Sequence, residues 1–160
     1  MISVLIIGLG RFGRHMAIKF QEQGNDVMAV EKDEARADEM APVIQNIQIG
    51  DATNEDFLRS LGVGNYDVCV VGIGESFQTA LEITVHLKDL GAKSVRACAT
   101  HPILSGPAKQ RLEDSAIEEL VLLNTVPIPE ERKISKMKML SVAPIFAEAM
   151  TRIFTNDSIS

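Results

Sequence analysis

Aromatic residues, basic residues and long apolar runs are all scarce in this sequence. Its 160 residues include six phenylalanines, one tyrosine and no tryptophan, too few aromatic rings to form a stacking platform for single-stranded nucleic acid. The 16 Lys and Arg residues are outnumbered by 22 Asp and Glu residues, which leaves a net charge of −6. Non-specific nucleic-acid binding depends on neutralising phosphates with basic side chains. We therefore expect no nucleic-acid partner.

No apolar run approaches the roughly 20 residues that a membrane-spanning helix requires, and no basic region with a cleavage site precedes the first apolar run. We therefore expect no direct insertion into a membrane and a cytoplasmic location. Cys69 and Cys98 lie within apolar runs and are expected to be small buried residues rather than a disulfide. The histidines, His15, His86 and His101, stand apart in the sequence, so we expect satisfied or exposed side chains and no metal site.

An apolar run at residues 4–7 leads directly into Gly-Leu-Gly-Arg-Phe-Gly at residues 8–13. Apolar residues then recur at helical spacing, so the pattern predicts a strand, a tight turn and a helix. Gly8 permits the turn, Gly10 has no side chain to keep a pyrophosphate from the backbone, and Gly13 lets helix and strand pack closely. The N–H groups at the start of the helix then face the phosphates. The alternative is a glycine turn that only packs a helix on a strand.

A carboxylate follows at the position where a nucleotide-binding fold needs one for a ribose. Glu31 ends the second apolar run, residues 27–30, and lies 18 residues after Gly13, close to the spacing at which an acidic residue accepts hydrogen bonds from ribose hydroxyls. Its charge would repel a 2′-phosphate, so we expect NAD or an adenine nucleotide rather than NADP. Arg11, within the turn, can clamp a phosphate or remain solvated.

The whole chain alternates strand-like runs with segments of helical periodicity. The expected strands cover residues 4–7, 26–30, 44–49, 66–73, 95–99, 120–123 and 139–142. The expected helices begin near residues 11, 33, 53 or 54, 76, 105 and 143. Strict alternation predicts a parallel sheet with right-handed crossovers. We predict the α/β class, as a single three-layer α/β/α Rossmann-like domain over residues 1–160, with strand order 3-2-1-4-5-6 and a seventh strand at an edge.

Ligands of such sheets bind at the carboxyl ends of the strands, where the strand order reverses between the first and fourth strands. Asp51 and Thr53 follow the third strand, and helix capping is an equally open interpretation for both. Two further glycines, Gly72 and Gly74, end the fourth strand. The predicted cofactor-binding residues are Gly8, Gly10, Arg11, Phe12, Gly13, Glu31, Lys32, Asp51, Ala52, Thr53, Gly72 and Gly74.

Several motifs occur together in the first 93 residues: Gly-Leu-Gly-Arg-Phe-Gly at 8–13, Glu31, Gly-Asp-Ala-Thr at 50–53, Ser-Leu-Gly-Val at 60–63, Asp67, and Gly-Ile-Gly at 72–74 before Gln78. Residues 1–93 thereby resemble the nucleotide-binding half of the KTN or RCK domains, cytosolic regulators of potassium channels and transporters. The resemblance implies that the 8–13 turn, through Gly8, Gly10, Arg11 and Gly13, holds phosphates. It also implies that Glu31 holds the ribose and that Asp51 and Thr53 lie on the adenine side. Domains of this family bind NAD(H), ATP or ADP and change a partner's gating without chemistry of their own.

The remaining residues follow a different pattern. They contain Ala-Thr-His-Pro-Ile-Leu-Ser-Gly-Pro-Ala at 99–108, Asn-Thr-Val-Pro at 124–127, Leu-Ser-Val-Ala-Pro at 140–144, Ala-Glu-Ala at 147–149 and Ser-Ile-Ser at 158–160. This part is similar to the carboxyl-terminal part of phosphoribosyl pyrophosphate synthetase. The seam is expected near residues 90–95, where both families have a helix, then Gly-Ala, then a strand.

One chain with half of each family, in continuous register and without a linker, is hard to explain except as an engineered recombination. We therefore interpret the sequence as a designed chimera, with a KTN-like part at 1–93 and a synthetase-like part at 94–160. Both parent families are oligomeric, but each lacks part of its assembly segments here. A monomer and a dimer both remain open.

The second resemblance also implies a lost activity. The synthetase transfers pyrophosphate from ATP to ribose 5-phosphate, using an acidic pair and an Asp-Thr-Ala-Gly-Thr loop after the strand that corresponds to residues 66–73. Here residues 72–79 read Gly-Ile-Gly-Glu-Ser-Phe-Gln-Thr, and the family's amino-terminal half is missing. Because these groups act together in phosphoryl transfer, we expect a non-catalytic protein that binds NAD(H), ATP, ADP or AMP. The alternatives are a relict ribose-phosphate pyrophosphokinase and a recombined fold without a ligand.

Overall fold

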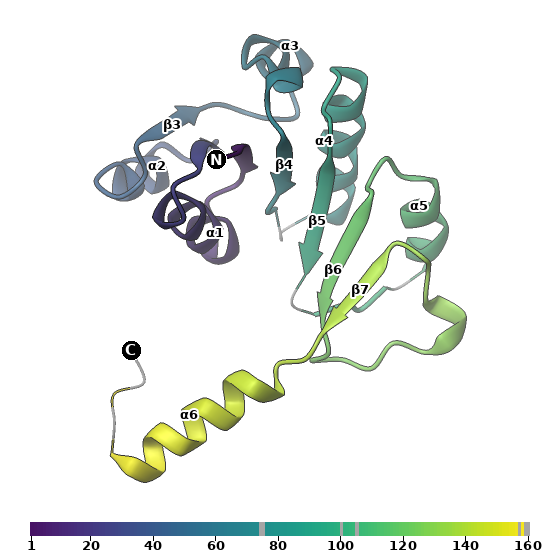
Figure 1. Ribbon diagram of the computed structural model, residues 1–160. Coiled ribbons are helices and arrows are strands. Elements are labelled where there is room, and N and C mark those ends of the chain that lie inside the picture. The colour runs from purple at the N-terminus through teal and green to yellow at the C-terminus, as the bar shows by residue number, and fades with distance from the viewer. Residues whose placement is uncertain (74–75, 100, 105, 157, 159–160) are drawn as a thin grey trace.

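The strands of the protein form one parallel sheet (Figure 1). The structure is a computed structural model that describes residues 1–73, 76–99, 101–104, 106–156 and 158. The strands are β1 (Ser3–Ile7), β2 (Asp26–Glu31), β3 (Asn46–Ile49), β4 (Val68–Val71), β5 (Val95–Ala99), β6 (Glu119–Leu123) and β7 (Met137–Leu140). They lie in the order β3-β2-β1-β4-β5-β6-β7, and each neighbouring pair is parallel. The predicted α/β class, strand order and edge position of the seventh strand are confirmed.

The helices connect or follow these strands. They are α1 (Arg11–Glu22), α2 (Glu34–Met40), α3 (Glu55–Ser60), α4 (Phe77–Asp89), α5 (Ala108–Asp114) and α6 (Ala143–Thr155), with 3₁₀ turns at Val63–Asn65 and Glu130–Arg132. Three helices begin at a capping side chain that accepts a backbone N–H three residues later. These caps are Asp33 for α2, Asn54 for α3 and Ser76 for α4.

The last strand is displaced from its predicted position. β7 begins at Met137 and ends at Leu140, two residues earlier than the predicted range 139–142. It pairs with β6 along its whole length, so β6 sets its register. Beyond the strand, the Asn124 side chain accepts the N–H of Val142 at 2.9 Å. This bond takes the backbone of Val142 out of the ladder and leads the chain into α6.

The centre of the sheet is buried on both faces. Leu5 and Ile7 of β1 pack on one face against side chains of α3 and α4. Val4 and Ile6 pack on the other face against side chains of α1 and α2. Each of these four residues is at most 1 % exposed, as expected for a parallel strand between two helical layers.

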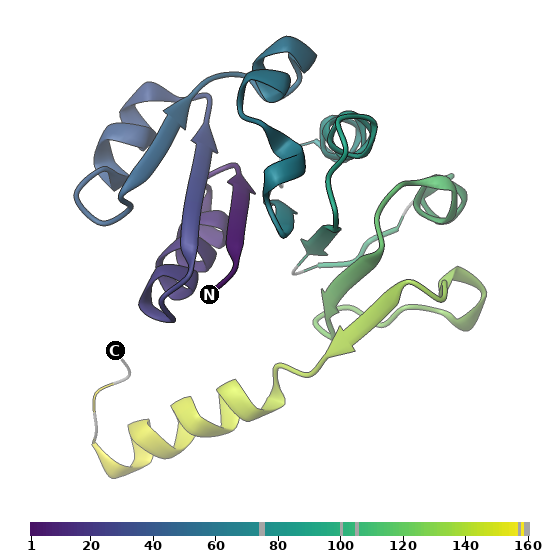
Figure 2. The same ribbon diagram turned by 45° about the horizontal axis from the view of Figure 1, so that its top comes forward.

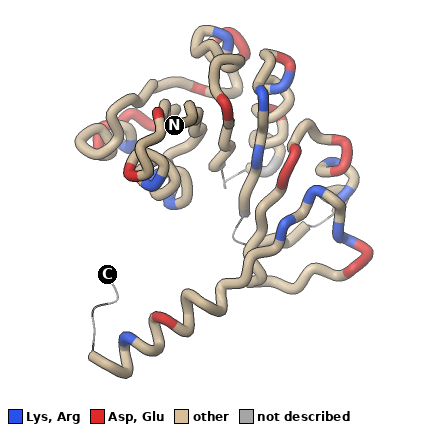
Figure 3. Tube along the Cα trace, viewed as in Figure 1, with Lys and Arg blue, Asp and Glu red and all other residues tan. Residues whose placement is uncertain are grey.

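The carboxyl-terminal part is packed differently. A smaller apolar cluster lies between β6 and α5, but α6 projects away from the sheet (Figures 1 and 2) and buries none of its side chains. Its two charged residues, Glu148 and Arg152, are visible in Figure 3 and form an ion pair at 2.7 Å. The helix predicted to begin at residue 143 is present, but it covers no face of the sheet. In the part of the chain described here, no helix is long and apolar enough to cross a membrane.

Candidate functional site

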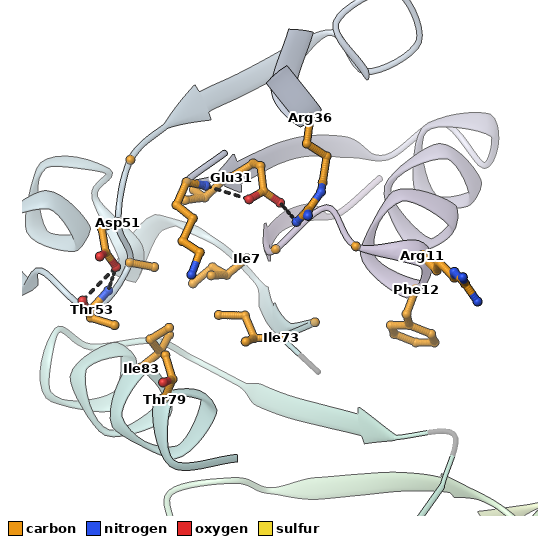
Figure 4. Close-up of a pocket in the computed structure, with 17 residues that line it drawn as sticks. Ile7, Arg11, Phe12, Glu31, Arg36, Asp51, Thr53, Ile73, Thr79 and Ile83 are labelled. Atoms are coloured by element: carbon orange, nitrogen blue, oxygen red, sulfur yellow. Dashed lines mark hydrogen bonds and ion pairs between the residues drawn. The ribbon is translucent and has the colours of Figure 1, made fainter. Parts of the chain in front are cut away.

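A cleft of about 590 Å³ opens at the carboxyl ends of β1, β2 and β4 (Figure 4). It lies where the strand order reverses, which is the place predicted for a ligand. Its volume falls within the range of roughly 300 to 1,000 Å³ that is usual for small-molecule sites. The predicted residues that line it are Gly8, Gly10, Arg11, Phe12, Glu31, Lys32, Asp51, Ala52, Thr53 and Gly72. Gly13 is not among its lining residues, and Gly74 is outside the described residues.

The three glycines of the turn meet different requirements. Gly8 has a φ of +93°, a left-handed conformation that strains other residues. A Cβ on Gly13 would stand 1.8 Å from the carbonyl oxygen of Gly8, so α1 can approach β1 only without a side chain there. Gly10 has a φ of −59°, and a Cβ on it would meet no atom within 4 Å beyond its chain neighbours. Neither backbone strain nor packing within the described protein explains a glycine at this position.

The amino-terminal end of α1 opens at the cleft without a side-chain cap. The next three helices each have a capping side chain, whereas Gly10 offers none. The first N–H groups of a helix have no acceptor within the helix, and the partial positive charge there favours an anion. The N–H groups of Arg11 and Phe12, which both line the cleft, are therefore donors at its edge, at the position predicted for phosphates.

Glu31, at the end of β2, is buried with 3 % of its surface exposed. Its Oε2 accepts the N–H of Leu9 at 2.7 Å and a hydrogen bond from Arg36 Nη1 at 3.4 Å. Its Oε1 accepts the N–H groups of Lys32 and Asp33 at 2.9 and 3.0 Å. The carboxylate thus connects the glycine turn to the start of α2, a role that the sequence pattern does not indicate.

The pKa of Glu31 lies below its ordinary value although the residue is buried. Burial alone would raise this pKa, but the N–H groups of Asp33 and Leu9 lower it, and the Arg36 guanidinium lowers it further. Glu31 is therefore ionised at neutral pH. A negative charge stands at the position predicted for the ribose.

Asp51 and Thr53 lie at the end of the cleft far from Arg11 (Figure 4). Asp51 Oδ1 accepts both the N–H and the hydroxyl of Thr53, at 2.9 and 2.8 Å. The two bonds lower the pKa of Asp51, and the nearby Lys32 adds to this effect. Neither residue caps α3, because Asn54 does. The capping alternative is therefore wrong, and both residues line the cleft.

Arg11 and Phe12 form the other end of the cleft. Phe12 is 41 % exposed, and Arg11 is exposed as well. Figure 4 shows the guanidinium of Arg11 pointing away from Glu31 and Ile73. The observed conformation matches the solvated alternative for Arg11, and a phosphate clamp would require another rotamer.

Several residues that line the cleft were not predicted from the sequence. They are Ile7, Val30, Arg36, Gly50, Ile73, Thr79 and Ile83. Thr79 and Ile83 lie one turn apart on α4, and this spacing places both on one face of the helix. Arg36 lies in the first turn of α2. The sequence indicates the helix start there, but not that the side chain of Arg36 turns back towards Glu31.

The two cysteines lie outside the cleft. Both are free; Cys69 is buried, as predicted, and Cys98 is half-buried. Burial raises the pKa of each thiol to about 11, so neither is a reactive thiolate at neutral pH. Within the described ranges, no group of three or more His, Cys, Asp or Glu side chains could hold a metal ion.

Comparisons with known sequences connect this chain to two families. Residues 4–118 match the TrkA-N domain family. The chain is also 46 % identical over 112 residues to a ribose-phosphate pyrophosphokinase of Clostridium perfringens, and this alignment covers 68 % of the chain and 35 % of the relative. The chain thus spans about a third of the length of the curated relatives it matches. Each match exceeds half of the chain, so the two overlap, and the TrkA-N match runs past the predicted seam at 90–95.

Solved structures of NAD-binding proteins and of a phosphoribosylpyrophosphate synthetase share the fold. The NAD(P)-binding domain of an exopolyphosphatase-related protein from Archaeoglobus fulgidus superposes with a TM-score of 0.61 at 15 % identity, over 98 % of this chain and 99 % of that one. Phosphoribosylpyrophosphate synthetase from Mycobacterium smegmatis gives 0.63 at 25 % identity, over 96 % and 45 % of the two chains. The GsuK channel bound to NAD gives 0.63 at 14 % identity, over 74 % and 21 %.

The resemblance to two families that was predicted from the sequence is therefore confirmed. The similarity to synthetases extends over much of the chain, and the pairing is consistent with the predicted chimera. Since the family match takes in more than half of the residues, the chain belongs to the TrkA-N domain family.

Proposed function

We propose that the chain is a non-catalytic module that binds an adenine-containing nucleotide in the cleft, with NAD(H) as the first candidate and ATP, ADP or AMP as alternatives. The observation that carries this proposal is Gly10. Its φ suits any residue, and a side chain on it would meet no atom within 4 Å beyond its chain neighbours. A ligand that approaches the backbone explains the glycine. A pyrophosphate suits this place because the uncapped start of α1 lies beside it.

The rest of the cleft suits the other parts of such a nucleotide. The ionised Glu31 can accept hydrogen bonds from ribose hydroxyls, and its charge favours NAD over NADP. At the far end, Asp51 and Thr53 flank the buried Ala52. Asp51 and Thr53 offer polar contacts to an adenine, and Ala52 offers an apolar contact. The NAD-bound GsuK channel and the NAD(P)-binding domain from A. fulgidus share the fold and support NAD as the first candidate.

We further propose that the chain is a designed, cytoplasmic chimera that is monomeric or dimeric and has no catalytic activity. The lack of catalytic activity is supported by residues 72–79, which hold a single carboxylate, Glu75, where the synthetase resemblance calls for an acidic pair and a phosphate loop. The chimera is supported by the matches to two families in one chain. A relict ribose-phosphate pyrophosphokinase is the second candidate, favoured by the 46 % identity to the C. perfringens enzyme. Release of AMP from ATP in the presence of ribose 5-phosphate would establish the second candidate and contradict the first.

Titration calorimetry with NADH, ATP and AMP tests the binding proposal, with Gly10→Ala as the informative variant. We expect the wild-type chain to bind NADH, and Gly10→Ala to bind it at least about tenfold more weakly because the added methyl group occupies the space of the pyrophosphate. The free energy of unfolding should change by less than about 1 kcal/mol, because a poorer helix cap and a less flexible unfolded chain offset each other.

Gly64→Ala is the matched control for this variant. A Cβ on Gly64 would lie 3.5 Å from the nearest atom, an ordinary contact, and Gly64 does not line the cleft. Binding should therefore be unchanged in this variant. No heat from any of the three ligands at millimolar concentration, or equal affinity in Gly10→Ala and the wild type, contradicts the proposal.

A further inference from the structure

The carboxylate of Glu31 has no acceptor position left for a ligand. An ionised carboxylate offers about four lone-pair positions, and four donors occupy them. The N–H of Leu9 and Arg36 Nη1 share Oε2, while the N–H groups of Lys32 and Asp33 share Oε1. A ribose hydroxyl can reach Glu31 only if one of these donors leaves.

The four donors differ in how easily they can leave. Three are backbone N–H groups, at 2.7 to 3.0 Å, and are fixed by the glycine turn and by the loop that leads into α2. Arg36 makes the longest of the four bonds, at 3.4 Å, through a flexible side chain that is 35 % exposed. Arg36 can move into solvent while its backbone N–H stays bonded to the cap Asp33. Figure 4 shows its guanidinium directed at the Glu31 carboxylate from the rim of the cleft.

We infer that Arg36 is a specificity-determining residue that competes with the ribose for Glu31, and that a nucleotide displaces it on binding. This inference rests on the proposed function and deepens it. A ligand with ribose hydroxyls can place one hydroxyl donor in the position that the guanidinium leaves, whereas a ligand without them offers no donor, so that Arg36 stays bonded to Glu31. Arg36 therefore lowers the preference of the cleft for ribose hydroxyls, because a hydroxyl must first break the ion pair between Arg36 and Glu31.

Removal of the competitor should strengthen the contribution of the hydroxyls. The test measures the dissociation constants of AMP and of 2′,3′-dideoxy-AMP with the wild type and with Arg36→Met, which keeps much of the side-chain length without the charge. The two ligands carry the same phosphate, so the long-range effect of losing one positive charge cancels in their ratio. We expect the preference for AMP over the dideoxy compound to rise about three- to tenfold in Arg36→Met, in line with the loss of a partly exposed ion pair.

Arg59→Met is the matched control. Arg59 pairs with Glu55 on α3 at 2.6 Å and does not line the cleft, so its loss removes the same charge and should leave the preference unchanged. A preference that stays the same or falls in Arg36→Met overturns the inference while the binding proposal stands. Failure of all three proteins to bind AMP would overturn the inference, and it would overturn the binding proposal as well if NADH and ATP also gave no heat. Binding of AMP by Arg36→Met alone would support the inference.

Discussion

Two helices of similar length, α1 and α6, lie in opposite environments. Both are amphipathic and both follow a parallel strand, but α1 packs on the sheet with Gly13 and Ala17 buried, whereas α6 buries no side chain. Along α6, Ile145, Phe146, Met150, Ile153 and Phe154 are between 62 and 92 % exposed. The apolar spacing of a helix therefore defines the face it offers, but does not ensure that a sheet receives it.

The connection before each helix accounts for the difference. Before α1, the turn at Gly8 reverses the chain at once, and the missing side chain at Gly13 lets the helix lie against β1. Before α6, the chain runs outward from β7 through Ser141 and Val142, whose only described backbone restraint to the sheet is the bond to Asn124. The close contact at the glycine turn fixes the position of α1, and α6 lacks an equivalent contact among the described residues.

The largest expected effect concerns α1, the helix that packs on the sheet. In Gly13→Ala, the new methyl carbon would lie 1.8 Å from the backbone oxygen of Gly8, and a backbone atom cannot move aside without opening the contact between α1 and β1. We expect a loss of about 3 kcal/mol or more in the free energy of unfolding, or failure to fold. Urea unfolding followed by circular dichroism measures this. A loss below about 1 kcal/mol would mean that the turn does not control the position of α1.

A pair of truncations compares a helix that packs on the sheet with one that does not. Leu87 of α4 is 0 % exposed, whereas Ile153 of α6 is 62 % exposed. Leu87→Ala should lower the free energy of unfolding by about 2 to 5 kcal/mol, because it leaves a cavity in the core. Ile153→Ala should change it by at most about 0.5 kcal/mol. Thermal and urea unfolding of both variants checks this, and similar losses in the two would show that α6 is packed in solution.

The features that the sequence predicted correctly are local or periodic. The strand order follows from the alternation of apolar runs with helical segments. The glycine spacing at residues 8–13 predicts the tight turn between β1 and α1. The cap at Asn54 was one of two local alternatives. The turn and the cap depend on residues within one or two turns of each other, which is the distance over which backbone sterics and capping act. The strand order follows the general rule for chains that alternate strands with helices.

The features that could not be predicted depend on residues that meet only in the fold. Glu31 was predicted to hold a ribose, but its four donors come from the turn, the loop and α2 together. The outward course of α6 depends on how the chain leaves β7, and the register of β7 depends on β6 rather than on its own residues. In each case the deciding partner lies outside the segment whose pattern was analysed.

The smallest expected effect concerns Asp67, whose contacts connect Ser3, at the start of β1, with Lys93, just before β5. Asp67, just before β4, accepts hydrogen bonds from the N–H and the hydroxyl of Ser3, at 3.0 and 3.1 Å. It also forms an ion pair with Lys93 at 3.0 Å. The Ser3 N–H above all, and then Lys93, lower the pKa of Asp67 from 3.8 to about 2. Because the pKa is lower in the folded protein, this group stabilises the fold above pH 4, and the stabilisation disappears as the pH falls towards 2.

Asp67→Asn should therefore be less stable than the wild type at pH 7, with a difference in melting temperature that closes between pH 4 and pH 2. Lys93→Met removes only the weaker contribution and should show the same trend with a smaller difference. A difference that does not change with pH would mean that Asp67 acts through packing rather than through its charge.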